Sequence, residues 1–164
     1  MESSNSAIKF MIYFIIVFGF LAIGTELFRI VKLTVDIKDS FQIILEDAIE
    51  LAVEDEYRKD HVTILRPGEC EENFESMLRD KYNLDYNFSP IGDSYFASPF
   101  IFESFDVNIG SYHVDEVRQR AVQDEGGHPS ARVKGYVEVK PLVIGVDANI
   151  KIPFNIYAES KRTD

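Results

Sequence analysis

An uncharged apolar run near the N-terminus constrains this chain more than any other feature. Between Lys9 and Glu26 lie 16 residues without a charged side chain, and ten of them are Phe, Ile, Leu or Val. On membrane-insertion scales, ten such residues favour insertion by roughly 3 to 6 kcal/mol. As a helix the run covers about 24 Å of the roughly 30 Å hydrocarbon core, and Ile8 and Phe28 extend it at its two ends. The sequence therefore predicts a transmembrane segment over residues 10–28, preceded by a tail over residues 1–9.

Two other interpretations of this run stay open. In the first it is a signal peptide with Lys9 as its basic start, residues 22–24 (AIG) as its cleavage site, and a soluble domain secreted after release at Gly24. No helix breaker or polar stretch separates the run from the next helical residues, which favours an uncleaved anchor. In the second it is a buried helix of a soluble core, although so apolar a segment at the extreme N-terminus favours lipid.

The charges that flank the run do not fix its orientation. Lys9 alone precedes it, whereas Arg29, Lys32 and Lys38 come after it. By the positive-inside rule these bases favour a cytoplasmic C-terminal domain. The domain beyond them is strongly acidic, however, since residues 33–164 carry 26 acidic and 14 basic side chains.

The helical pattern continues past the apolar run. Residues 29–58 contain neither Gly nor Pro, and apolar residues recur there at steps of three, four and seven, which is typical of an amphipathic helix. The stripe consists of Ile37, Phe41, Ile44, Ala48, Leu51 and Ala52. If both segments form one helix, it is a continuous rod of roughly 75 Å. Its first third would lie in lipid and its last third would pack on a domain.

Residues 59–164 read as a small acidic α+β domain. We expect a helix over residues 71–82 and a strand within residues 100–109. Residues 132–140 and 149–158 alternate apolar and polar side chains, which predicts an antiparallel pair of strands with one face on a core. Because Pro153 cannot donate a hydrogen bond to a ladder, its strand should lie at an edge or contain a bulge. The expected fold class is α+β, with the long helix packed on a small antiparallel sheet.

Composition and motifs argue against several classes of function. The net charge of −11 is unsuited to binding nucleic acid, and a single cysteine excludes an internal disulfide. Cys70 lies among glutamates, which disfavour a reactive thiolate, so we expect a structural or surface cysteine. The three histidines (His61, His113 and His128) are expected in polar loops, and the acidic run over residues 46–56 is expected to be a solvated face. The sequence thus predicts a protein that is not an enzyme and holds no cofactor and no metal.

The local sequence resembles one known family. Residues 23–29 (IGTELFR) and the helical residues 45–52 (LEDAIELA) are similar to the TadE-like pseudopilins of tight-adherence (Flp) pili. In that family an apolar span ends in Gly-x-x-Glu-Phe-Gly-Arg or a similar motif, followed by an Ala-rich helix and late Val-rich strands. The resemblance covers roughly residues 10–55. The chain lacks the Pro that the family usually has in the span and the upstream Gly and Glu-Phe pair near the prepilin peptidase site.

The resemblance implies a membrane-anchored structural subunit of a pilus or secretion-type assembly, with its acidic domain outside the cytoplasmic membrane. Its expected partners are the lipid bilayer and other subunits that pack along the N-terminal helix. Gly19 and Gly24 would permit close approach of helices there, through faces that include Phe28. Glu26 either marks the boundary with water or is compensated in lipid by a base, which would be Arg29 three residues on or Arg29 of a neighbouring subunit.

A third possibility is an anchored binding or scaffold subunit of a secretion, conjugation or sporulation machine that forms no filament. It shares every sequence feature of the pilin-like interpretation except self-assembly. Heteromeric copurification without filaments would distinguish it. The two interpretations predict the same fold.

Overall fold

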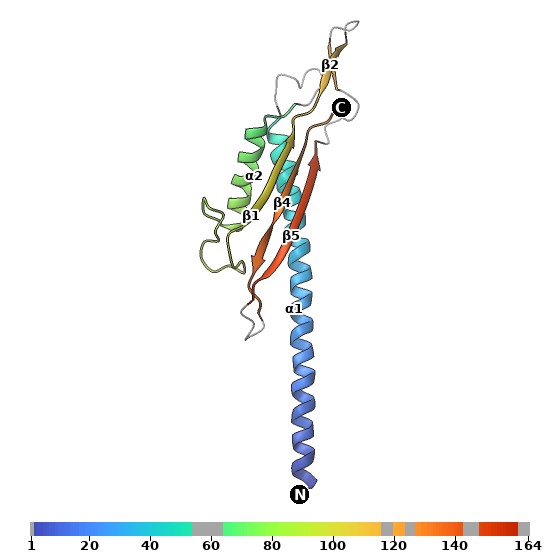
Figure 1. Ribbon diagram of the computed structural model, residues 1–164, viewed down its shortest axis with the longest axis vertical. Helices are drawn as coiled ribbons and strands as arrows, with labels where there is room; N and C mark the ends of the chain where they lie inside the picture. Colours follow the sequence, from blue (N-terminus) through green and yellow to red (C-terminus); the bar gives the residue numbers. More distant parts are fainter. Residues whose placement is uncertain (1, 54–63, 116–119, 124–126, 143–147, 161–164) are drawn as a thin grey trace.

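A computed structural model of the protein describes residues 2–53, 64–115, 120–123, 127–142 and 148–160. It consists of a long helical rod with a small α+β domain built on its C-terminal half (Figure 1). The helices are α1 (Glu2–Leu51) and α2 (Pro67–Tyr82). The strands are β1 (Ile101–Asn108), β2 (Tyr112–Asp115), β3 (Arg120–Gln123), β4 (Ser130–Val139) and β5 (Ile150–Glu159).

Helix α1 is unbroken over 50 residues, which confirms the single rod. It begins at Glu2, so the helix includes nearly all of the expected tail over residues 1–9. It ends at Leu51, whereas the sequence extended the amphipathic segment to residue 58. The chain leaves the helix because its next peptide groups bind elsewhere: the N–H of Arg66 donates to the carbonyl of Ala52 at 3.1 Å, and Val53 forms a bridge with Leu65. Residues 54–58 lie outside the described residues.

The main sheet has three antiparallel strands in the order β1-β4-β5. The two C-terminal strands pair in continuous register from Ser130 opposite Glu159 to Val139 opposite Ile150, as the alternation predicted. Strand β5 lies at the edge of this sheet, which confirms the position expected for the strand of Pro153. The expected link around residues 145–147 lies outside the described residues.

The core lies between the sheet, the C-terminal half of α1, and α2 (Figure 1). Phe41 is fully buried at its centre and contacts four aromatic rings. These rings, at centroid distances of 4.7 to 6.3 Å, are Phe74, Tyr82, Phe100 and Phe154. The predicted stripe on α1 is buried except at Leu51, which lies at its margin and is 61% exposed, while Leu45 and Ile49 widen the stripe on the other side.

Two elements differ from the sequence expectation. Helix α2 begins at Pro67 instead of residue 71, because proline is well suited to the first turn of a helix, where its missing N–H is not needed. Strands β2 and β3 form a separate hairpin that the sequence did not predict. His113 was expected in a loop and lies in β2, opposite Val122.

Candidate functional site

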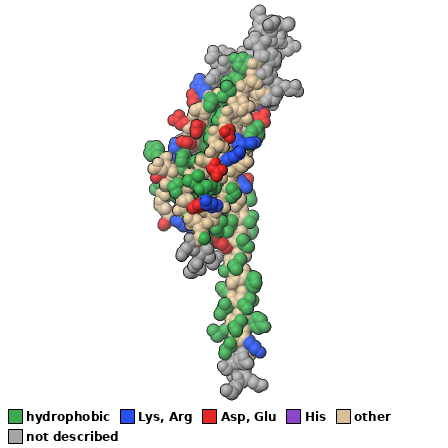
Figure 2. Space-filling view, in the orientation of Figure 1, with side chains coloured by type: hydrophobic (Ala, Val, Ile, Leu, Met, Phe, Trp, Pro, Cys, Tyr) green, Lys and Arg blue, Asp and Glu red, His purple; other side chains and the backbone are tan. Residues whose placement is uncertain are grey.

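The N-terminal half of α1 protrudes from the domain and is apolar on all sides. Every residue from 6 to 25 is exposed, so no part of the domain covers this stretch (Figure 2). Among the large apolar side chains, exposure reaches 71% at Phe10 and 73% at Phe20. Within the described part of the chain, α1 is the one helix with the length and apolar composition needed to cross a membrane.

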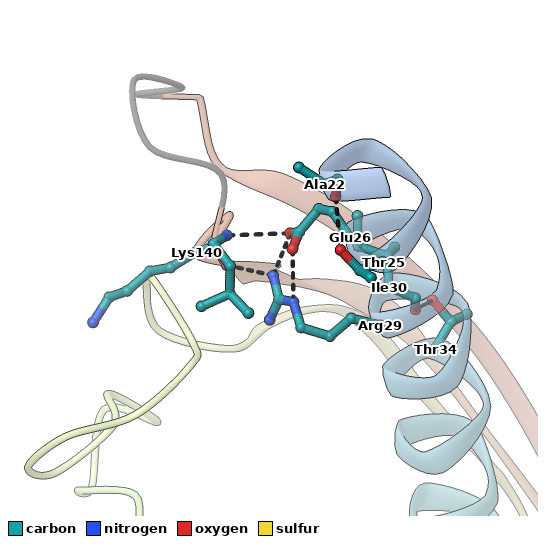
Figure 3. Close-up of polar contacts among 8 residues, drawn as sticks. Ala22, Thr25, Glu26, Arg29, Ile30, Thr34 and Lys140 are labelled. Carbon is teal, nitrogen blue, oxygen red and sulfur yellow. Dashed lines mark hydrogen bonds and ion pairs between the residues drawn. The ribbon is translucent and has the colours of Figure 1, made fainter. Parts of the chain in front are cut away.

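A polar cluster lies at the end of the protruding half, where α1 meets the domain. Arg29 binds the carboxylate of Glu26 through two nitrogens: Nε donates to Oε2 at 3.1 Å, and Nη2 donates to Oε1 (Figure 3). The two residues are one helical turn apart, and only 10% of the Glu26 side chain and 20% of the Arg29 side chain are exposed. Such a bidentate pair is stronger than one neutral hydrogen bond, because it makes two hydrogen bonds and both join charged groups.

The same two side chains hold the end of the sheet. Arg29 Nη2 also donates to the carbonyl oxygen of Lys140 at 2.7 Å, and the N–H of Leu142 donates to Glu26 Oε1 at 3.3 Å. Lys140 and Leu142 directly follow β4 and lie more than 110 residues away in sequence. We call Glu26, Arg29, Lys140 and Leu142 the junction, since they fasten the base of the domain to the rod. Figure 3 shows Glu26 and Arg29 pointing toward one another and toward the main chain of Lys140.

The structure distributes the five expected assembly residues between the junction and the bare rod. Glu26 and Arg29 meet, so the pairing within the helix is confirmed. Gly19 and Gly24 lie on the protruding half with nothing within 4 Å of where a Cβ would stand. Phe28 is 73% exposed. Pairing of Glu26 with a base of a neighbouring subunit stays a prediction, as does packing along the two glycines.

Sequence reasoning missed Lys140 and Leu142. Both join the junction through main-chain atoms, the carbonyl of Lys140 and the N–H of Leu142. A main-chain contact leaves no signature in side-chain types. The one available signal is the end of the alternating strand at Lys140–Pro141, which marks a turn at that end of the sheet without saying what it meets.

The residues with catalytic potential are dispersed. Cys70 is fully buried in α2, and burial, together with the negative charge of Glu71, raises the pKa of its thiol to about 11. This is the chemistry of an inert structural cysteine. Among the described residues, no three His, Cys, Asp or Glu side chains gather in a way that could hold a metal ion. His61 lies outside the described residues. His128 lies in a segment without regular secondary structure just before β4, as expected of a loop histidine.

The acidic face of α1 is less solvated than expected. Asp47 is exposed, but Glu46 and Glu50 are only partly so. Gln42 Nε2 donates to Glu46 Oε1 at 2.8 Å, and Ser160 Oγ donates to Glu50 Oε1 at 3.2 Å. Glu50 therefore attaches the chain just after β5 to the helix, and Glu46 holds Gln42, whose Nε2 also donates to the carbonyl of Tyr157 in β5 at 3.1 Å. The remaining acidic residues of the run, Glu54, Asp55 and Glu56, lie outside the described part of the chain.

Two hollows are lined entirely by residues that the structure describes. One, of about 40 Å³, lies between α2 and β1 and is lined by Phe74, Phe102 and Phe105 with two glutamates at its rim. The other, of about 270 Å³, is an open depression on the outer face of the sheet beside Arg132 and Tyr157. Neither resembles an enclosed pocket that buries most of a small molecule.

Comparison with protein-family models, with curated proteins and with solved structures finds no match for this chain.

Proposed function

We propose that the chain is a single-pass, membrane-anchored structural subunit of a pilin-like assembly, with its acidic domain outside the cytoplasmic membrane. The observation that carries the proposal is the division of α1 into two halves. The first half is apolar and exposed on all sides, and the second forms the core of an α+β domain. An exposed apolar surface of this extent needs a cover, which lipid and neighbouring helices supply.

Three further observations support this role. The helix passes from one half to the other without a break, so a subunit can transmit force or position from lipid to domain. Gly19 and Gly24 leave the helix backbone open to close approach. The resemblance of residues 23–29 to the TadE-like pseudopilins supplies both the filament-type role and the outward orientation.

The decisive experiment is fractionation of cells that produce the full chain, combined with protease protection. We expect the protein in the membrane fraction, with the acidic domain degraded by protease added to intact cells after permeabilisation of any outer layer. Recovery in the soluble fraction with a mature N-terminus at Thr25 would instead establish the secreted form. Protection of the domain from added protease would place it in the cytoplasm and overturn the orientation.

Self-assembly is tested by Glu26→Ala. Removing the carboxylate is expected to lower the yield of crosslinked oligomer several-fold while membrane insertion is retained, because the apolar run is unchanged. The single native cysteine, Cys70, is buried, so a cysteine introduced at Leu21 provides the reactive thiol for crosslinking in membranes. Asp39→Ala controls for the loss of one negative charge from the same helix, since Asp39 is exposed and lies outside the junction.

The outcome also separates the pilin-like role from a scaffold role. Equal oligomer yields for Glu26→Ala and the parent chain would count against assembly through Glu26. Copurification of unlike subunits, with no homo-oligomer and no filament by electron microscopy, would favour the anchored scaffold.

A further inference from the structure

The junction fixes how far the domain stands from the end of the apolar run, and this distance is short. We propose that the base of the domain rests on the bilayer itself, with Leu142 inserted into the interfacial layer of lipid headgroups beside the anchoring helix. This inference rests on the proposed membrane anchor and adds a second, separate contact with lipid.

The first argument is the level at which Leu142 is held. Its N–H is bound to the carboxylate of Glu26, the first charged residue after the apolar run. An α-helix rises about 1.5 Å per residue, so Glu26 lies only about 1.5 Å along the axis from Thr25, the last residue of the uncharged run. The neighbouring carbonyl of Lys140 is bound by Arg29, so two contacts fix the base at this level.

The second argument is the length of the span. Its 16 uncharged residues cover about 24 Å, roughly 6 Å less than the hydrocarbon core. If the shortfall is divided equally between the two ends, the hydrocarbon boundary lies about 3 Å beyond Thr25, level with Leu27. The headgroup layer extends several ångströms further on each side. Glu26 lies within about 1.5 Å of this boundary, so Leu142 is held where the hydrocarbon core meets the interfacial layer and not in bulk water.

The third argument is the character of the base. Leu142 is 69% exposed although it is tethered at its main chain, so its side chain is free to meet a surface. Leu27 and Phe28, on other sides of α1 at this level, are 59% and 73% exposed, so apolar side chains surround the rod where the base is attached. The Lys140 N–H also donates to the carbonyl of Tyr95 at 2.8 Å, so a further hydrogen bond holds this end of the sheet in place.

The chain contains no tryptophan, so one introduced tryptophan reports its own surroundings. Three variants of the full chain are compared in phosphatidylcholine vesicles that contain lipids brominated near the headgroup or near the chain end. Leu142→Trp reports the base. Tyr13→Trp reports the span, and Tyr157→Trp reports β5 seven strand positions from the base, roughly 24 Å away.

We expect lipid brominated near the headgroup to reduce the emission of Leu142→Trp by about two-fold or more, as for a side chain in the interfacial layer. Tyr13→Trp should be quenched by deeply brominated lipid, and Tyr157→Trp by neither. Quenching at Tyr13→Trp without quenching at Leu142→Trp would overturn the inference and leave the anchor intact. Absence of quenching at Tyr13→Trp would overturn the anchor, and the inference with it.

The junction itself is tested by adding Arg29→Gln to Leu142→Trp. Losing the bidentate pair should release the base and reduce its quenching towards the level of Tyr157→Trp, while a Tyr13→Trp, Arg29→Gln pair keeps its deep quenching. Unchanged quenching would show that the junction does not position the base. Emission of Leu142→Trp that is blue-shifted, is not quenched by brominated lipid and increases with the protein-to-lipid ratio would show that a second copy covers Leu142. That result also overturns the lipid contact.

Discussion

The two halves of α1 belong to one helix but differ in how their apolar side chains are covered. Residues 10–25 are exposed and present apolar side chains around the whole circumference, whereas residues 37–52 bury one stripe and leave the other side at the surface. A helix that is apolar all round requires an apolar surrounding on every side, and a striped helix requires a partner on one side. The difference shows that only the C-terminal half depends on this chain's own fold for its cover.

The largest expected effect comes from the centre of the core. Phe41→Ala should lower the free energy of unfolding by about 3–5 kcal/mol, because it removes a fully buried ring packed against four others. Urea unfolding in mild detergent, followed by near-UV circular dichroism of the tyrosines, measures the loss. Phe20→Ala is the matched control: Phe20 is 73% exposed on the same helix and should leave domain stability unchanged. Similar losses for both variants would contradict the comparison.

The reverse test acts on the protruding half. Ile16→Lys should reduce membrane insertion by about 3–4 kcal/mol while the free energy of unfolding of the domain stays the same. Partition of the full chain between membrane and aqueous fractions measures the change. Val35→Lys is the control, since Val35 is 50% exposed and lies beyond the predicted span. If both lysines impaired insertion equally, the boundary of the span at residue 28 would be wrong.

Glycines sharpen the same contrast. A Cβ on Gly135 would meet the main-chain oxygen of Ile101 and lie 2.8 Å from the ring of Phe154, so Gly135→Ala should destabilise the domain by roughly 1–3 kcal/mol. Gly24→Ala meets nothing within 4 Å and should leave the domain unaffected. Urea unfolding measures both. A loss of crosslinked oligomer for Gly24→Ala, with domain stability intact, would assign Gly24 to packing between subunits.

These contrasts explain which parts of the molecule were predictable from sequence. The rod, the stripe around Phe41, and strands β4 and β5 each arise from a local period of apolar residues, and the edge position of β5 arises from the missing N–H of Pro153. Half of the candidate site was also predictable, because Glu26 and Arg29 are neighbours on one turn.

The other half of the site depends on contacts that no local pattern records. Lys140 and Leu142 reach Glu26 and Arg29 through main-chain atoms, and only the three-dimensional path of β4 brings them to that level of the rod. The end of α1 at Leu51 was missed for a similar reason. Residues up to 58 are compatible with helix, and the pairing of Val53 with Leu65 decides against it.

The smallest expected effect is a pH dependence confined to the domain half. The folded pKa of Cys70 is raised to about 11 by burial and by Glu71, against about 9 in the unfolded chain. Because the fold favours the protonated thiol, the contribution of Cys70 to stability is complete below about pH 9 and is lost as pH rises through about 11. The free energy of unfolding should fall by about 1–2 kcal/mol over that window.

The control variant is Cys70→Ala. It removes the contribution of the thiol to the slope of the free energy of unfolding against pH, and it retains the contribution of Tyr82, whose pKa is also raised by burial. Parallel stability curves for the parent chain and Cys70→Ala would show that the thiol remains solvated, and would weaken the contrast between a dry core and a rod that depends on lipid for its cover.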